Sequence, residues 1–182
     1  MNKTRRLFVG VPLSGALRKR LTREMQLWPS LAMLRSAEEN LHVTLLYLGF
    51  VNEEQIAEIS QKLGEVCAVS HSFDLVFSWI KLKENKELPK MIWLEGEASD
   101  DLKYLVENIE KAFAVFISEK KSYRPHVTLG KIRKSVWLKL QDKPQIEKKL
   151  RLAESVDAVC LYESLSIHGK RRYEPIDSFP LA

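Results

Sequence analysis

The sequence His42-Val43-Thr44-Leu45 occurs a second time, letter for letter, as His126-Val127-Thr128-Leu129. The chain has only 4 His, so two identical words that each contain one are a strong signal rather than a chance motif match. Side chains at positions i and i+2 of a β-strand point to the same face, and those at i+1 and i+3 point to the other. Each copy therefore predicts a strand with His and Thr on one face and with Val and Leu packed into a core.

The polar faces of these two strands predict acid–base chemistry at a phosphodiester. An imidazole titrates near pH ~6.5, so at neutral pH one His can be neutral while another is protonated. The neutral ring can take a proton from water, and the protonated ring can give one to the leaving oxygen. Two Thr hydroxyls can donate hydrogen bonds to the non-bridging phosphate oxygens. We therefore predict that His42 and His126 are catalytic and that Thr44 and Thr128 bind phosphate.

Two other interpretations of the histidines have to be weighed. A single His on a strand is more often a half-buried structural residue than a catalytic one, but packing alone does not require the same polar pair twice. A zinc site needs further ligands, and no acidic residue or Cys stands at a ligand spacing from either His. We therefore expect neither a metal nor another cofactor. His71 and His168 lack a Thr partner and fall in a predicted loop and a predicted turn.

The composition is that of an ordinary globular protein that can bind an anionic partner. The chain of 182 residues is 45% hydrophobic and 29% charged, with a formal net charge of +5, and we interpret residues 1–182 as one domain made of two closely joined lobes. Cys67 and Cys160 stand in apolar surroundings and indicate reduced core residues of a cytoplasmic protein. No apolar run approaches the ~18 residues of a membrane span. No heptad repeat suggests an oligomer, so we expect a monomer.

Hydrophobic periodicity predicts an α+β fold with antiparallel sheets. The pattern indicates helices after the capping residues Ser14, Asn52 and Ser99, and a weaker helix near 145–151. The predicted strands cover residues 6–12, 41–48, 73–82, 91–94, 126–132, 156–162 and 172–179. The order around both motif copies is helix, motif strand, helix, strand. This order indicates two related lobes that each contribute one motif strand to a shared cleft.

Basic residues near the second motif are candidates for binding the substrate. Arg124 and Lys131 flank that motif and would contribute positive potential at a phosphate site. The segment 170–173 could close over a ligand with Arg172 and with the ring of Tyr173, on which a base could stack. An ordinary strand aromatic is an equally good interpretation of Tyr173.

With their flanking residues, the two motifs resemble the 2H phosphoesterases, in particular the bacterial RNA 2′,3′-cyclic phosphodiesterases, also called the 2′-5′ RNA ligase or LigT-like branch. The resemblance covers nearly the whole chain. Its specific part is the two HxTx words with Pro125 before the second His. Supporting stretches are Arg6-Leu7-Phe8-Val9, Glu39-Asn40-Leu41, Ile92-Trp93-Leu94, Tyr123-Arg124 and Leu161-Tyr162-Glu163-Ser164 through Arg172-Tyr173. Lys131 stands where many bacterial members carry Arg.

The resemblance implies a bilobal fold, with two pseudo-symmetric lobes of antiparallel sheet and flanking helices around a central cleft. It implies that a terminal 2′,3′-cyclic phosphate of RNA is opened to a 2′-phosphate without a metal ion. His42 matches the proton donor to the leaving 3′-oxygen, His126 matches the proton acceptor that activates water, and Thr44 and Thr128 match the phosphate-holding hydroxyls. Some relatives join tRNA fragments through a 2′-5′ bond.

Other substrates and another class of function are compatible with the same residues. The substrate could instead be a small cyclic phosphate or a 2′-5′ oligonucleotide. A non-catalytic RNA-binding module would bind RNA without turnover. An ATP-driven ligase is disfavoured because the chain has no Gly-rich phosphate loop of the P-loop type.

Overall fold

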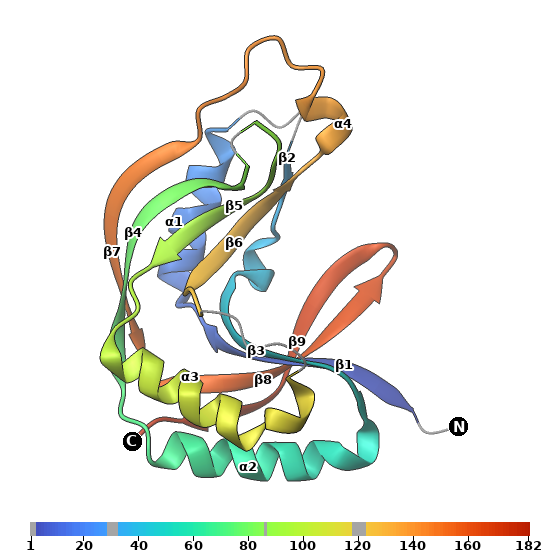
Figure 1. Cartoon of the computed structure of the whole chain (residues 1–182), viewed down its shortest axis with the longest axis vertical. Helices are drawn as coiled ribbons and strands as arrows, with labels where there is room; N and C mark the ends of the chain where they lie inside the picture. Colours follow the sequence, from blue (N-terminus) through green and yellow to red (C-terminus); the bar gives the residue numbers. More distant parts are fainter. Residues whose placement is uncertain (1–2, 29–32, 86, 118–122) are drawn as a thin grey trace.

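The computed structural model describes residues 3–28, 33–85, 87–117 and 123–182. Their strands form a 9-stranded antiparallel sheet in the order β7-β4-β5-β6-β3-β1-β8-β9, with β2 paired to β6 (Figure 1). The bounds are β1 Thr4–Pro12, β2 Met33–Arg35, β3 His42–Asn52, β4 Phe73–Glu84, β5 Pro89–Gly96, β6 His126–Ile132, β7 Glu147–Val156, β8 Ala158–Ile167 and β9 Lys170–Pro180. The predicted strand over 126–132 is confirmed at both ends.

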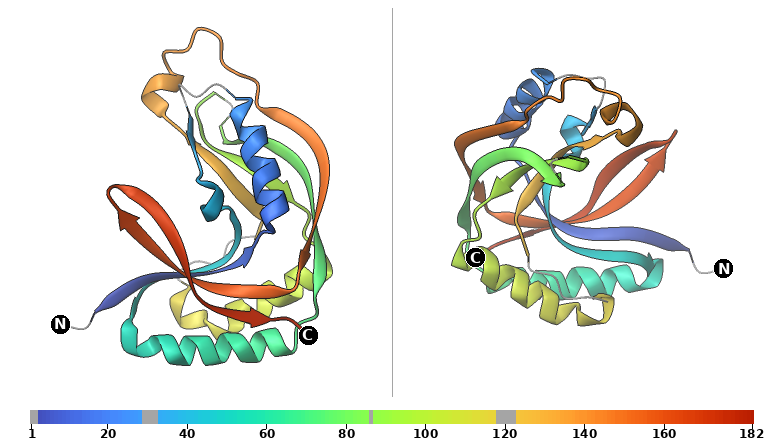
Figure 2. Two further views of the ribbon diagram at one scale, coloured as in Figure 1. Left: turned by 180° about the vertical axis from the view of Figure 1, so that it is seen from behind. Right: turned by 45° about the horizontal axis from the view of Figure 1, so that its top comes forward.

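The sheet divides where the two motif strands meet. β3 and β6 pair at a single position, Val43 opposite Val127. On one side lie β7, β4, β5 and β6 with helix α1 (Gly15–Gln26), which we call the β6 half. On the other lie β3, β1, β8 and β9 with helices α2 (Ile56–Ala68) and α3 (Asp100–Ala112), which we call the β3 half (Figures 1 and 2). Each half therefore contributes one motif strand to the junction.

Helices α1 and α3 begin after their predicted caps, whereas Asn52 caps the short 3-10 helix Glu53–Gln55 and α2 begins after Gln55. The Ser14 side chain accepts a hydrogen bond from the Leu17 N–H, and the Ser99 side chain accepts one from the Leu102 N–H, both at 3.2 Å. The Ser14 hydroxyl also donates to the buried Glu154 carboxylate of β7 at 3.0 Å. This contact ties the start of α1 to the sheet of the β6 half.

The apolar residues of both motif copies lie in the hydrophobic core, as the strand period predicts. Val43, Val127 and Leu129 have no exposed surface and Leu45 is 5% exposed. Helices α2 and α3 contribute buried side chains to this core, Ile59, Leu63, Cys67, Leu102, Leu105, Val106 and Ile109. The His and Thr faces of the motif strands point away from that core.

Several boundaries differ from the predicted ones. The prediction of a weak helix near 145–151 is wrong, because residues 147–151 belong to β7, which pairs with β4. That pairing buries Leu152, Glu154 and Val156 alternately, so tertiary contacts override a marginal helical pattern. β3 continues past Gly49, which adopts a φ of 77° beside a register shift, rather than ending there. The predicted strand over 156–162 also divides, since Val156 ends β7 and Ala158 begins β8.

Shorter elements complete the description. The four-residue helix α4 (Lys134–Trp137) was not predicted, and short 3-10 helices cover Glu38–Asn40, Glu53–Gln55 and Ala114–Phe116. Pro29, the predicted end of the first helix, lies outside the described residues. His71 is exposed ahead of β4, and His168 lies in the β8–β9 turn at a φ of 48°. None of the described helices is long and apolar enough to cross a membrane.

Candidate functional site

The junction of the two halves brings the four predicted site residues together. In an antiparallel pair the residue numbers of opposite positions have a constant sum. Extending the Val43–Val127 register by one residue in each direction therefore places His42 opposite Thr128 and Thr44 opposite His126. The two motifs run antiparallel about this pair, and the His–Thr contact that the structure describes joins His42 to Thr44 of its own strand at 2.9 Å. All four side chains are partly exposed on one face of the sheet.

Both imidazole rings are held in the same way. The Nδ1 atom of His42 lies 2.7 Å from the Asn40 carbonyl oxygen, and that of His126 lies 2.8 Å from the Arg124 carbonyl oxygen. A carbonyl oxygen only accepts hydrogen bonds, so Nδ1 carries the proton and donates it in each ring. The Nε2 atom is thus the nitrogen of each ring that can exchange protons. A neutral Nε2 can act as a base, and a protonated one can act as an acid.

Aromatic rings surround His42. Its ring centroid lies 4.8 Å from that of Phe8 and 5.1 Å from that of Tyr173, which meets it edge-on. Its Nε2 atom lies 2.9 Å from the Thr44 hydroxyl oxygen, so Thr44 is in direct contact with the reactive nitrogen. These contacts fix the orientation of the ring.

His126 is stacked on one aromatic ring and lies near charged side chains. Its ring stacks on Trp93 of β5 with centroids 3.5 Å apart. The Lys83 ammonium lies 5.0 Å from the Trp93 ring and pairs with Glu95 at 2.6 Å. Glu95 also pairs with Lys81 at 2.8 Å and stands opposite His126 across β5 and β6. Sequence patterns do not mark these four residues as neighbours of His126, because they come from strands that the sequence does not show to be adjacent.

The surroundings lower the pKa values of both rings and so favour their neutral forms. Burial lowers the pKa of His42 below its ordinary value of 6.5; the Asn40 carbonyl raises this pKa by less, and the nearby His126 lowers it further. Burial also lowers the pKa of His126; the Arg124 carbonyl raises this pKa by less, and the charges of Lys83, which lowers it, and of Glu95, which raises it, follow.

Two polar side chains connect the motif strands to other parts of the fold. The Asn40 side chain donates to the Arg171 carbonyl at 2.8 Å and accepts from the Tyr173 N–H at 3.0 Å. Asn40 therefore links the β8–β9 hairpin to the ring of His42. The Tyr123 hydroxyl, at the entry to β6, donates to the Thr44 carbonyl at 3.1 Å. Burial raises the pKa of Tyr123, so this phenol stays a hydrogen-bond donor.

The predicted substrate-binding residues have different positions. Lys131 is exposed, and a register shift between β5 and β6 places it on the same face as Thr128 and Trp93. The Arg124 side chain is exposed, and its carbonyl holds His126. Arg172 lies on the opposite face of β9 from Tyr173 and pairs with Glu174 at 3.1 Å. The arginine that shares the face of Tyr173 is Arg171.

The absence of a side chain at Gly10 lets β1 pack closely against the backbone of β3 and the ring of His42. A Cβ atom at this position would lie 2.9 Å from the Val43 carbonyl oxygen and 3.3 Å from the His42 ring. We expect Gly10→Ala to displace the ring and to reduce activity by about tenfold or more, because small misplacements of a catalytic group are costly. Steady-state kinetics would measure the loss. Gly15→Ala is the matched control, since a Cβ there meets nothing within 4 Å, and equal rates for the two variants would contradict the prediction.

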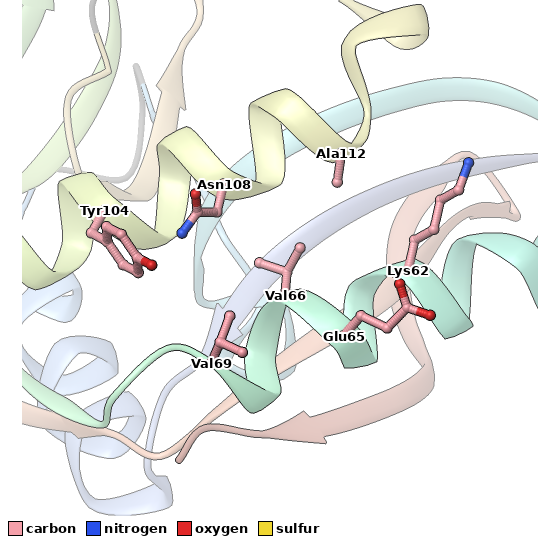
Figure 3. A pocket seen from close by; sticks show the side chains of 7 residues that line it. All are labelled: Lys62, Glu65, Val66, Val69, Tyr104, Asn108 and Ala112. Carbon is pink, nitrogen blue, oxygen red and sulfur yellow. The ribbon is translucent and has the colours of Figure 1, made fainter.

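A second concave feature lies elsewhere. A groove of about 440 Å³ runs between α2 and α3 and is lined by Lys62, Glu65, Val66, Val69, Tyr104, Asn108 and Ala112 (Figure 3). These helices pack against the core face of the sheet, opposite the histidines. The groove contains neither a His nor a Cys. Within the described ranges no three His, Cys, Asp or Glu side chains are grouped so that they could hold a metal ion.

Comparison with known proteins places the chain in a family. A family model described as the 2′-5′ RNA ligase superfamily matches residues 16–166, a range that contains both motif copies. The chain belongs to this superfamily. Its fold matches the expected α+β architecture, an antiparallel sheet with flanking helices, which is therefore confirmed.

Individual relatives of this 2′-5′ RNA ligase superfamily member are modestly similar in sequence. The RNA 2′,3′-cyclic phosphodiesterase of Archaeoglobus fulgidus is 28% identical over 131 residues, which are 71% of this chain and 73% of that protein. The RNA 2′,3′-cyclic phosphodiesterase of Bacillus subtilis is 28% identical over 127 residues, 68% of this chain and 69% of that protein.

Solved structures of the same fold resemble the chain over nearly its full length. TT0787 of Thermus thermophilus superposes with a TM-score of 0.84 at 19% identity, and the match covers 97% of both chains. LigT of E. coli, crystallised with 3′-AMP, superposes with a TM-score of 0.77 at 23% identity, covering 98% of this chain and 99% of LigT. The antiparallel arrangement of the motifs therefore lies within a fold that the superfamily member shares with these proteins.

Proposed function

We propose that the protein hydrolyses the terminal 2′,3′-cyclic phosphodiester of RNA to a 2′-phosphomonoester by metal-independent catalysis with two histidines. The observation that carries this proposal is the antiparallel placement of His42 with Thr44 and His126 with Thr128, with both Nδ1 atoms held by carbonyls. Membership of the 2′-5′ RNA ligase superfamily supports it, as do relatives named for this activity. LigT, of the same fold, has been crystallised with 3′-AMP and with phosphate.

The proposed reaction is a displacement at phosphorus with two proton transfers. Water attacks the phosphorus while the Nε2 atom of His126 takes its proton. The bond from phosphorus to the 3′-oxygen breaks, and the protonated Nε2 atom of His42 gives its proton to that oxygen. The 2′-oxygen stays bonded, so the product carries a 2′-phosphate and a 3′-hydroxyl. The hydroxyls of Thr44 and Thr128 donate to the non-bridging oxygens and stabilise the negative charge that grows on them.

The charges near the two rings support this division of roles. Burial and the Lys83 ammonium lower the pKa of His126, against the Arg124 carbonyl and the Glu95 carboxylate, which raise it, and the lowered pKa favours the neutral form that a base needs. The influence of Lys83 is not found at His42, where burial and the other histidine are the lowering causes. When an anionic phosphate binds, it raises both pKa values, and His42 is the ring that takes up the proton. Binding of the anionic phosphate thus favours the protonated form of His42, which the general acid needs.

The same proton transfers would also join RNA ends. If the 5′-hydroxyl of a second RNA replaced water, His126 would accept the proton of that hydroxyl, and the product would be a 2′-5′ phosphodiester. We include this ligation in the proposal, with tRNA fragments among the substrates. A monomeric state and a cytoplasmic location remain predictions from the sequence.

The direct test uses a short RNA that ends in a 2′,3′-cyclic phosphate, incubated with the protein in excess EDTA. Chromatography of the product then gives the position of the phosphate. A 2′-phosphate supports the proposal, and a 3′-phosphate would show that the 2′-oxygen leaves instead. Activity that returns only with added metal would contradict the two-histidine scheme. Turnover of a small cyclic phosphate or a 2′-5′ oligonucleotide alone would assign a different substrate, and RNA affinity without turnover would indicate a binding module.

The lowered pKa values predict an acidic pH optimum for the free enzyme. The base must be neutral and the acid must be protonated, and kcat/KM reports these states in the free protein. Because the pKa of His42 is below 6.5, its protonated fraction falls as pH rises through that lowered value. We expect kcat/KM to be highest on the acidic side of pH 6.5 and to fall toward neutral pH. The optimum of kcat should lie at higher pH, because the bound anion raises the pKa of His42.

Lys83→Met supplies the control for this pH profile. Loss of the ammonium removes a cause that lowers the pKa of His126, so the rising limb of kcat/KM should move to higher pH. A shift of the falling limb instead would mean that His126 is the acid and that the two roles are exchanged.

A further inference from the structure

Two bulges in β3 determine which of its side chains share a face with the catalytic residues. The register along β1 runs Gly10–Thr44, Phe8–Tyr47 and Arg6–Phe50, with shifts between Val9 and Gly10 and between Leu7 and Phe8. Leu45 and Leu48 are the extra residues of β3, and both are 5% exposed. Thr44, Tyr47 and Phe50 therefore point to the same side although they are three residues apart. β-Bulges near active sites commonly redirect side chains in this way.

The side chains that the bulges align are exposed aromatic rings. Tyr47 is 66% exposed and Phe50 is 75% exposed. The Tyr47 hydroxyl lies 3.4 Å from the Thr44 hydroxyl, so the row of rings begins at the phosphate site. Exposed aromatic rings contribute little to the hydrophobic core. They can instead stack on nucleobases, and this stacking does not depend on the nucleotide sequence.

Positive charge accompanies these rings. Arg6 is exposed opposite Phe50 on β1, and Arg171 is exposed on the same face of β9 as Tyr173. Both guanidinium groups are close enough to lower the pKa of Tyr173 against the larger effect of its burial. The carboxylates of Glu163 and Glu174 on the neighbouring β8 and β9 pair with Arg5 and Arg172, and Asp177, farther along β9, accepts a hydrogen bond from the Ser178 N–H. This surface, which we call the β3 flank, is formed by Arg6, Tyr47, Phe50 and Arg171 and is positive.

The proposed mechanism determines on which side of the phosphorus the RNA chain must lie. His42 protonates the leaving 3′-oxygen, so the terminal ribose lies on the side of His42. Water approaches from the side of His126, where the β6 half presents Lys83, Trp79 and Lys149. The β3 flank extends from Thr44 on the ribose side. The nucleotides that precede the terminal one have their bases and phosphates on that side too.

We propose that the β3 flank binds single-stranded RNA on the 5′ side of the terminal nucleotide, with bases stacked on Tyr47 and Phe50 and phosphates paired with Arg6 and Arg171. This inference rests on the proposed function and goes beyond it, because it makes the natural substrate a polynucleotide rather than a cyclic mononucleotide. Stacking supplies affinity without base selectivity. The arginines supply a contribution that depends on salt.

The experiment compares two substrates with the same terminal nucleotide, a nucleoside 2′,3′-cyclic monophosphate and a short single-stranded RNA that ends in it. For the wild type, kcat/KM should be higher for the RNA. Phe50→Ala should lower kcat/KM for the RNA by about tenfold, the typical value of one base–ring stack, and leave the mononucleotide unaffected. Phe50→Trp should retain the preference for RNA. Arg6→Gln should weaken the salt dependence for the RNA alone.

Matched controls test other positions in the same way. Tyr104→Ala removes an aromatic ring that is 54% exposed in the groove of Figure 3, and it should change neither substrate. Lys149→Ala removes a charge from the opposite side of the phosphorus, where its ammonium lies 5.8 Å from the Trp79 ring, and it should also leave the preference for RNA intact.

Affinity for a labelled RNA with a 2′-phosphate end, measured by fluorescence anisotropy, tests the flank independently of turnover. Weaker binding by Phe50→Ala would support the β3 flank as an RNA-binding surface even if the reaction proved different. Failure of the proposed function can therefore be distinguished from failure of this inference. Unchanged affinity would overturn it, as would an equal loss of kcat/KM for both substrates. If Lys149→Ala lost the preference for RNA, the RNA would instead bind on the β6 half, on the side of His126. A change of oligomeric state in Phe50→Ala would make this face an interface between copies of the chain.

Discussion

Replacing His42 or His126 with Ala is expected to lower kcat for the RNA cyclic phosphate by about 10³- to 10⁴-fold, the upper range for loss of a general acid or base. Each ring supplies one of two proton transfers in the same displacement, so neither can substitute for the other. The double variant should lose little more than either single one, because residues that act as a unit have non-additive effects. Single-turnover kinetics with saturating protein would measure the loss in the chemical step.

The other two histidines provide controls with the same substitution. His71 and His168 are exposed outside the motifs, and His71→Ala and His168→Ala should retain wild-type rates. Circular dichroism and thermal unfolding would show that all four variants are folded. A rate within a few fold of wild type for His42→Ala or His126→Ala would refute the two-histidine mechanism.

Thr44→Val and Thr128→Val are expected to lower kcat by about 10²- to 10³-fold, as when one donor to a developing oxyanion is removed. Valine keeps the branched shape that suits a strand and removes only the hydroxyl donor. The two losses should be similar, because each hydroxyl lies on the same strand face as the histidine of its own motif, at the junction of β3 and β6. The expected loss appears in kcat more than in KM, since the negative charge is largest in the transition state.

Serine substitutions separate the hydroxyl from the rest of the side chain. Thr44→Ser and Thr128→Ser keep the donor and should recover most of the lost rate. If only one of the two valine variants were impaired, a single hydroxyl would hold the phosphate, and the symmetric arrangement of donors would be wrong.

The motif residues show what period and chemistry can predict from sequence. Strand alternation puts Val43 and Val127 in the core and the His and Thr side chains on the other face, as found. The caps Ser14 and Ser99 are local features that sequence also reveals. The family follows from the same short words, since a superfamily model matches the region that contains them.

The remaining parts of the site depend on contacts between distant segments. The stacking of Trp93 on His126 requires the pairing of β5 with β6, and no local pattern encodes that pairing. The bulges at Leu45 and Leu48 break the alternation on which face assignments rest. Arg171 rather than Arg172 shares the face of Tyr173, because β9 begins at Lys170, ahead of the predicted strand over 172–179, and its side chains alternate. Side-chain partners such as Asn40 are not marked by spacing at all.

The acid and the base belong to different halves of the molecule, and the strands that carry them meet at one residue pair, Val43 with Val127. The distance between the two Nε2 atoms is therefore a property of this seam, and neither half contains a complete catalytic device. The Tyr123–Thr44 hydrogen bond, at 3.1 Å, is a second connection across the same seam. The two halves share one hydrophobic core, so a substitution that weakens this seam should lower turnover before that core unfolds, and loss of activity should precede loss of structure on heating or in denaturant.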